Sequence, residues 1–375
     1  MTAVAVALRT SRSFNSLRLR TVHPQLGACH RSSSRLGGGS NIRFTAPDRM
    51  SSISAGLKRM HRAEATAVVE LATSISSPSR PAILLIHGLD SSKQTWTSVA
   101  ADLTSIGYPV LAVDLRGHGE SPLGDANDFG PAALATDVLS AARGSGASGP
   151  FVVVGHSMGG RVAMRLAAME PSAVACLVVE DMDVRPRQVP QAVIDLESSA
   201  AMDRFRADSG RRFESWEEAK AALAPWYDEE RMESWKGARI RQALTPASSS
   251  SPSPGQASWW WSDVNPMAMT LAYRTVLASR DGGEAWAELA ALTGAGGRPP
   301  FPIHLWVADP SMTVCNWDGP GGISTMKASV PVAEVREWPG AAHSIHNTAR
   351  PEFVAELKRL ADQAASWNGL PKHTS

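Results

Sequence analysis

A single serine stands between glycines in the segment GHSMGG, residues 155–160. The segment follows the apolar run PFVVV and leads directly into RVAMRLAAME, which has a helical pattern. A strand, a tight turn and a helix form the setting in which a nucleophilic serine is presented at the end of a sheet. The glycines two positions either side of Ser157 keep side chains out of such a turn. Ser157 is therefore the candidate nucleophile.

A serine hydroxyl needs a base to take its proton, an acid to orient that base, and donors for the oxyanion. We expect the donors to be the backbone N–H groups of Met158, which follows the serine, and of Leu89, in the loop after PAILLIHG. The base is expected beyond the last strand, where the segment AAHSIH offers His343, with His346 as the reserve.

The acid has two candidates. Asp181 ends the strand-like run ACLVVED, and Asp309 ends the later run PIHLWVAD. Both would lie at the carboxyl edge of a parallel sheet, within reach of His343. Alternation along a strand would turn Glu180 away from Asp181. The residues alone leave the choice between Asp181 and Asp309 open.

The elements that must position these residues alternate between strand-like and helical segments. Strand-like apolar runs lie within 65–73, 81–88, 108–121, 151–157, 175–181, 302–309 and 333–340. Continuous apolar strands separated by helices predict an α/β fold, with a mostly parallel central sheet and helices on both of its faces.

Composition divides the chain into a leader, a core in two parts and an insertion. The leader is expected at 1–50, and the core at 66–183 and 299–368. A helical cap is expected at 184–298, with a Ser/Pro-rich surface loop at 245–258. The cap stretch holds seven of the twelve tryptophans. These favour either an apolar wall for an acyl group or simple packing of the cap, and both interpretations stay open.

The leader has a composition of its own. Residues 1–47 contain seven arginines and no lysine, aspartate or glutamate. A segment rich in arginine and serine and without acids is typical of an organellar transit peptide. It predicts a location in the mitochondrial matrix or the chloroplast stroma, and composition does not separate these two. The alternative interpretation is a basic arm that binds nucleic acid.

Charge, hydropathy and cysteine content argue against several other classes. Residues 1–47 contain seven of the 37 basic side chains, so the rest of the chain has 30 basic against 36 acidic side chains, a balance unsuited to nucleic-acid binding. No apolar run reaches the roughly 18 residues that a transmembrane helix requires. Cys29, Cys176 and Cys315 are far apart and predict neither a disulfide framework nor a zinc site. We expect no metal and no organic cofactor.

Taken together, the His-Gly loop after a strand, DLRGHGES, GHSMGG and the late AHSIH resemble the α/β-hydrolase superfamily, over about residues 66–368. More narrowly, HGLDSSKQTW, GHSMGG and WSDVNPMAM resemble the serine esterases around abhydrolase domain-containing protein 11. This resemblance implies a capped ester or thioester hydrolase, mitochondrial in animals, and it places the acid at Asp181. The later strand ends in ADPS, which departs from the pattern of these esterases, so Asp309 remains a candidate for the acid. Ala342, before His343, stands where these esterases usually have glycine.

The sequence therefore predicts a carboxylic ester or thioester hydrolase that acts on a small-molecule acyl ester. Ser157, Asp181 and His343 would form its triad, and the reaction would pass through an acyl-enzyme. The alternatives are hydrolysis of a carbon–carbon bond or acyl transfer by the same triad, and a ligand receptor with little turnover. The natural substrate and the oligomeric state stay open.

Overall fold

The computed structural model describes residues 69–72, 80–147, 149–197, 211–224, 227–237, 239–244, 258–293 and 299–367 of the 375-residue chain. All of these belong to one unit of the chain. The leader expected at 1–50 lies outside the described residues, and so does 245–257 of the expected Ser/Pro-rich loop. The boundaries proposed for the leader and the loop therefore stay predictions.

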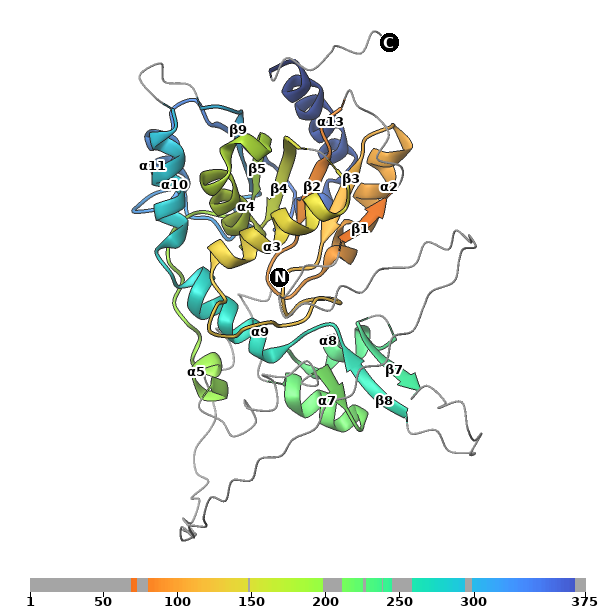
Figure 1. Ribbon diagram of the computed structural model, residues 1–375. Coiled ribbons are helices and arrows are strands. Elements are labelled where there is room, and N and C mark those ends of the chain that lie inside the picture. Colours follow the sequence, from red (N-terminus) through yellow and green to blue (C-terminus); the bar gives the residue numbers. More distant parts are fainter. Residues whose placement is uncertain are drawn as a thin grey trace, which may run out of the picture. The chain divides into compact units, whose positions relative to one another are not determined.

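The described residues form a seven-stranded sheet in the order β1-β3-β2-β4-β5-β9-β10 (Figure 1). The strands are β1 (Val69–Ala72), β2 (Ile83–Ile86), β3 (Val110–Val113), β4 (Phe151–His156), β5 (Val174–Glu180), β9 (Ile303–Ala308) and β10 (Glu334–Trp338). β1 runs antiparallel to β3, and the other neighbours are parallel. Strands β2 to β5 and β9 are buried along their whole length, so their sequences are mostly apolar, with His156, Glu180 and His304 as the polar exceptions. The predicted α/β fold is confirmed.

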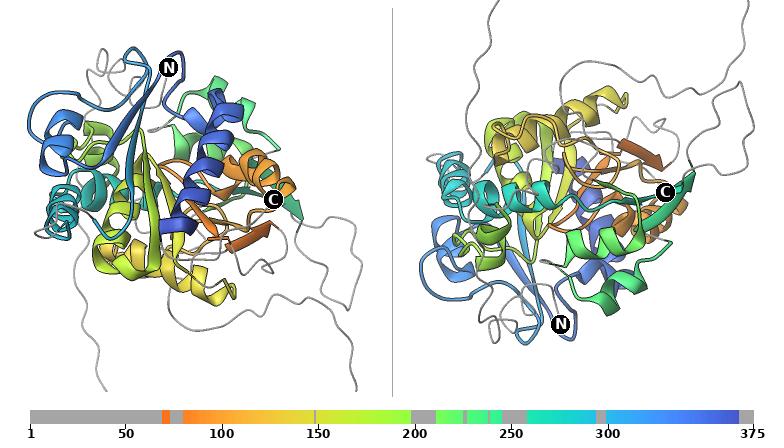
Figure 2. Two further views of the ribbon diagram at one scale, coloured as in Figure 1. Left: turned by 90° about the horizontal axis from the view of Figure 1, so that it is seen from above. Right: turned by 90° about the horizontal axis from the view of Figure 1, so that it is seen from below.

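Helices pack on both faces of the sheet (Figure 2). One face carries α3 (Pro131–Gly144), α4 (Met158–Met169), α10 (Asp281–Ala291) and α11 (Ile323–Ser329), and the other carries α2 (Thr97–Ser105) and α13 (Arg350–Trp367). Three short elements complete the core: η1 (Lys93–Trp96), η2 (Pro171–Ala173) and α12 (Ile345–Thr348). In the part of the chain that the structure describes, no helix is long and apolar enough to cross a membrane.

An aromatic cluster holds α13 against the sheet. The ring of Phe353 lies 5.0 Å from that of Trp306, and Trp306 lies 5.1 Å from Trp338, measured between ring centroids. All three side chains are buried. The segment between β10 and α13 carries His343, so this cluster anchors both ends of the segment that presents the candidate base.

The insertion between β5 and β9 differs from the mostly helical cap that we expected at 184–298. It contains a three-stranded antiparallel sheet, β6 (Arg212–Phe213), β8 (Ser258–Ser262) and β7 (Ile240–Leu244), in the order β6-β8-β7. Among its described residues, the helical elements are α5 (Gln191–Glu197), α7 (Trp216–Leu223), α8 (Glu229–Ser234), α9 (Pro266–Leu271) and the π-helix η4 (Ala272–Leu277), together with α10 on the core.

The three consecutive tryptophans of β8 explain this difference. Large aromatic side chains favour a pleated, half-buried surface, where they pack against residues on neighbouring strands. Trp260 pairs with Phe213 on one side and Gln242 on the other, and its ring lies 5.0 Å from that of Trp216 on α7. These three tryptophans, which lie in the stretch expected to be a helical cap, therefore form the middle strand of a small sheet.

Phe353→Ala should lower the free energy of unfolding by roughly 3–5 kcal/mol, because it empties a fully buried aromatic site that the sheet cannot refill. Urea denaturation of the full chain, followed by tryptophan fluorescence, measures this change. The control is Val332→Ala, whose side chain is 43% exposed and should change stability by less than about 0.5 kcal/mol. Equal effects of the two substitutions would contradict the anchoring role of the cluster.

Candidate active site

Ser157 is the single residue between a strand and a helix. β4 ends at His156, α4 begins at Met158, and Ser157 between them has φ 52° and ψ −122°. A positive φ is unusual for a residue with a side chain, and the surrounding contacts must hold it in place. Its N–H donates to the carbonyl oxygen of Glu180 on β5 at 2.9 Å. The turn therefore fixes the serine at the carboxyl end of the central strands.

The glycines of GHSMGG are required by contact distances. A Cβ on Gly155 would lie 2.2 Å from the carbonyl oxygen of Gly159, and a Cβ on Gly159 would lie 2.4 Å from that of His87. Both distances are shorter than any side chain tolerates. The start of α4 thus packs directly on the backbone of β4 and of the loop after β2, which explains the spacing seen in the sequence.

The two expected oxyanion donors lie on either side of this contact. Met158 is the first residue of α4, where backbone N–H groups have no acceptor within the helix and the helix dipole favours negative charge. Leu89 follows Gly88, on which a Cβ would lie 3.0 Å from the Cβ of Ser157. The loop after β2 therefore passes beside the serine, with Leu89 one residue further along.

Asp181 and His343 are joined by a hydrogen bond. Nδ1 of His343 lies 2.6 Å from Oδ2 of Asp181, which is fully buried. Burial acts to raise the pKa of Asp181, but His343, the Thr313 hydroxyl and the Ala308 N–H outweigh burial, so the pKa is lowered. An ionised carboxylate only accepts hydrogen bonds, so Nδ1 of His343 is the donor in this bond, and in the tautomer with one ring proton Nε2 is an acceptor.

Asp181 is also held in place by the last residue of β9 and by residues that follow the strand. It accepts hydrogen bonds from the N–H of Ala308 at 3.0 Å, the N–H of Val314 at 3.1 Å and the hydroxyl of Thr313. These donors fix the carboxylate in one orientation, so that Oδ2 faces the histidine. Sequence reasoning did not identify Thr313, which lies 132 residues from Asp181 and belongs to no motif.

Asp309, the reserve acid, lies in a different hydrogen-bond network. Its Oδ1 accepts from the N–H and hydroxyl of Ser311 at 2.9 and 2.6 Å, and its Oδ2 accepts from the N–H of Gly340 at 2.9 Å. The Ser311 hydroxyl and these two N–H groups lower the pKa of Asp309 to about 2. Asp309 thus braces the turn after β9, and Asp181 is the candidate acid that bonds to His343.

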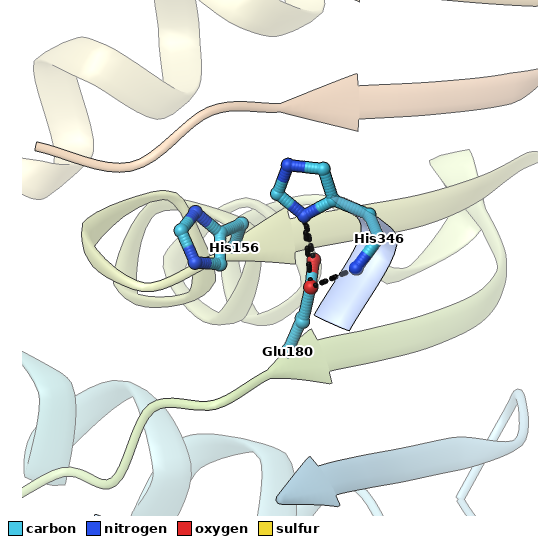
Figure 3. Close-up of side chains that lie close together, drawn as sticks. All are labelled: His156, Glu180 and His346. Carbon is cyan, nitrogen blue, oxygen red and sulfur yellow. Dashed lines mark hydrogen bonds and ion pairs between the residues drawn. The ribbon is translucent and has the colours of Figure 1, made fainter. Parts of the chain in front are cut away.

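His346, the reserve base, bonds to Glu180 (Figure 3). The Glu180 carboxylate accepts from the backbone N–H of His346 at 2.9 Å and lies 2.8 Å from its Nδ1. Nε2 of His346 lies 2.9 Å from the hydroxyl of Thr95, and the ring lies 4.1 Å from that of Trp96. With both ring nitrogens occupied and the side chain fully buried, His346 supports the segment that carries His343.

His156 connects the serine turn to the same segment. Its Nε2 lies 3.1 Å from the carbonyl oxygen of His343, and the two rings are 4.6 Å apart. Burial, together with His343 and His346 nearby, holds the pKa of His156 well below its usual value. The ring is therefore neutral and donates from Nε2 to that carbonyl. Sequence reasoning missed this residue because the strand position next to a nucleophile has no required side-chain type.

His156, Glu180 and His346 are also the residue types that bind metal ions. One nitrogen or oxygen from each lies within 4.8 Å of the others (Figure 3). Hydrogen bonds within the protein already engage the Glu180 carboxylate, both ring nitrogens of His346 and Nε2 of His156. The geometry is therefore that of a buried hydrogen-bond network beneath the serine turn.

The strained backbone is concentrated at this site. Three residues other than glycine have a positive φ among those described: Asp90 at 62°, Ser157 at 52° and Asp181 at 48°. They follow β2, β4 and β5, at the same edge of the sheet. Such conformations persist where surrounding contacts determine them, and they concentrate at functional sites.

Comparison with known proteins agrees with this architecture. The alpha/beta hydrolase family matches residues 83–357. An esterase from a marine microorganism has a similar structure, with a TM-score of 0.54 at 18% identity over 79% of this chain and 100% of that one. E-2-(acetamidomethylene)succinate hydrolase gives a TM-score of 0.52 at 21% identity, over 80% of this chain and 98% of that one. At these identities, the structures show the fold.

Curated relatives match over shorter stretches. Lipase LipV of Mycobacterium tuberculosis is 39% identical over 138 residues, which are 34% of this chain and 49% of the lipase. The sn-1-specific diacylglycerol lipase ABHD11 of Mus musculus is 43% identical over 103 residues, 27% of this chain and 33% of the mouse protein. The chain therefore spans about a third to a half of the length of these relatives. The family match covers most of the chain, and this protein belongs to the alpha/beta hydrolase family.

Proposed function

We propose that this protein is a serine hydrolase that cleaves carboxylic esters or thioesters through an acyl-enzyme. The observation that carries the proposal is the hydrogen bond between buried Asp181 and His343, at the sheet edge where Ser157 occupies its strained turn. The similar curated proteins, both named as lipases, support the same reaction class.

In this mechanism the hydroxyl oxygen of Ser157 attacks the acyl carbonyl carbon while Nε2 of His343 accepts the hydroxyl proton. Asp181 holds the ring in the tautomer that leaves Nε2 free and stabilises the imidazolium that forms. The N–H groups of Leu89 and Met158 donate to the oxyanion. His343 then returns the proton to the leaving alkoxide or thiolate.

Water completes the cycle. It attacks the acyl-enzyme as His343 removes its proton, and the carboxylic acid leaves as Ser157 recovers its hydrogen. Every proton transfer in this reaction passes through His343. The proposed mechanism therefore needs no metal and no organic cofactor. The substrate is a small acyl ester, and the lipase names among the relatives make glycerol esters of fatty acids the first class to assay.

Asp181→Asn should lower the turnover of p-nitrophenyl esters by a factor on the order of 10⁴, because the amide favours the wrong tautomer of the histidine. Asp309→Asn should leave turnover near that of the wild type, because its carboxylate bonds to the turn after β9. Steady-state kinetics on esters of increasing chain length measure both effects. The reverse ranking of the two variants would make Asp309 the acid, and no turnover by the wild type on any ester would favour a receptor.

We also propose that the protein is imported into an organelle, the mitochondrial matrix or the chloroplast stroma. The arginine-rich and acid-free composition of residues 1–47 supports this proposal. The full chain with a C-terminal fluorescent tag should enter the organelle, and the same chain lacking residues 1–50 should stay outside. Identical distributions of the two proteins would contradict the proposal.

A further inference from the structure

Arg239 in the cap bonds to the core loop that follows β2. Its Nη2 donates to the backbone carbonyl of Asp90 at 2.9 Å, and its Nη1 donates to the Asp90 carboxylate at 3.2 Å. Its Nε donates to Asp263 at 3.0 Å, and its guanidinium stacks 4.4 Å from the ring centroid of Trp235. The guanidinium is thus fixed on one side by cap residues and on the other by the core loop.

Asp90 is the residue next to the expected oxyanion donor. It follows Leu89 in the turn after β2, and its φ of 62° is a conformation that few residues other than glycine adopt. A backbone in this region is kept there by its surroundings. The hydrogen bond from Arg239 to the Asp90 carbonyl acts on the backbone itself, in addition to the ion pair with the side chain.

Further hydrogen bonds hold the cap residues on this side of the contact. Asp263, whose carboxylate accepts from Arg239, follows β8. Its backbone N–H donates to the carbonyl oxygen of Arg239 at 3.0 Å, and its own carbonyl oxygen accepts from the N–H of Gly119 in the core at 3.1 Å. Arg231 on α8 also approaches the Asp90 carboxylate, at 3.4 Å. Burial raises the pKa of Asp90 and the two arginines oppose that shift, so loss of Arg239 would leave a buried carboxylate with a weaker partner.

We propose that Arg239 is a positioning residue that holds the Leu89–Asp90 turn in the conformation that directs the Leu89 N–H at the oxyanion. This inference rests on the proposed function. An amide direction is set by the backbone dihedrals on both sides, so a turn that relaxes at Asp90 also moves its neighbour. The cap would then complete the oxyanion site of the core as well as covering it.

Arg239→Met in the full chain tests this proposal. It should lower kcat by roughly 10- to 100-fold and leave KM within about twofold, because the oxyanion contact strengthens in the transition state. The matched control is Arg241→Met. Arg241 lies two residues away on β7, and its guanidinium stacks on Trp261 at 4.7 Å. This control should keep the kcat of the wild type.

A second readout separates positioning from general damage to the cap. A boronic acid that adds to the serine places an oxygen in the oxyanion site. Its affinity should fall in parallel with kcat/KM in Arg239→Met, and stay unchanged in Arg241→Met. Adding Asp90→Gly to Arg239→Met should recover at least about threefold of the lost kcat, because glycine adopts a positive φ without strain and leaves no unpaired carboxylate.

Each outcome decides the question. Equal kcat and boronate affinity for the variants of Arg239 and Arg241 would overturn the positioning role while the esterase proposal stands. If Arg239→Met does not fold, Arg239→Lys with and without Asp90→Gly replaces it, because lysine keeps the charge but cannot bond to two acceptors as a fork. No rescue by Asp90→Gly would then overturn the role. No turnover by the wild type overturns the proposed function, and the inference with it.

Discussion

The candidate active site depends on close backbone packing around the turn that carries Ser157. α4 begins so close to the end of β4 that side chains at Gly155 and Gly159 would overlap backbone carbonyls. Ser157 has a positive φ within this contact, and the loop after β2 lies against the same turn. The serine is therefore presented by packing of the backbone, and the parallel strands supply the rigid base that this packing needs.

Two adjacent acids at the end of β5, Glu180 and Asp181, each bond to one of the two histidines in the segment between β10 and α13. Asp181 and Glu180 are adjacent, so their side chains point in different directions. Asp181 bonds to His343, and Glu180 bonds to both the ring and the backbone N–H of His346. A buried charge is tolerated where hydrogen bonds satisfy it, and here each carboxylate has a histidine partner. His343 is thus the candidate base, and His346 supports the segment that carries it.

The sequence predicted those parts of the structure that repeat or that motifs define. The apolar runs predicted the parallel sheet, and GHSMGG predicted the strand–turn–helix at Ser157. Two acids at strand ends could not be ranked from spacing, because the choice depends on donors such as Thr313 and Gly340, which lie far from them in the chain. The cap sheet was missed because three adjacent tryptophans fit a helix and a strand equally well until their neighbours are known. Arg239 and Asp90 are 149 residues apart, and no local pattern links them.

The most direct test of the central claim is the position of the covalent adduct after the full chain reacts with a fluorophosphonate. Intact mass and peptide mapping should show one added phosphonyl group, on the peptide that contains Ser157, and none after Ser157→Ala. A folded wild-type chain that gains no adduct, or gains it on another residue, would contradict the claim that this turn presents an activated nucleophile.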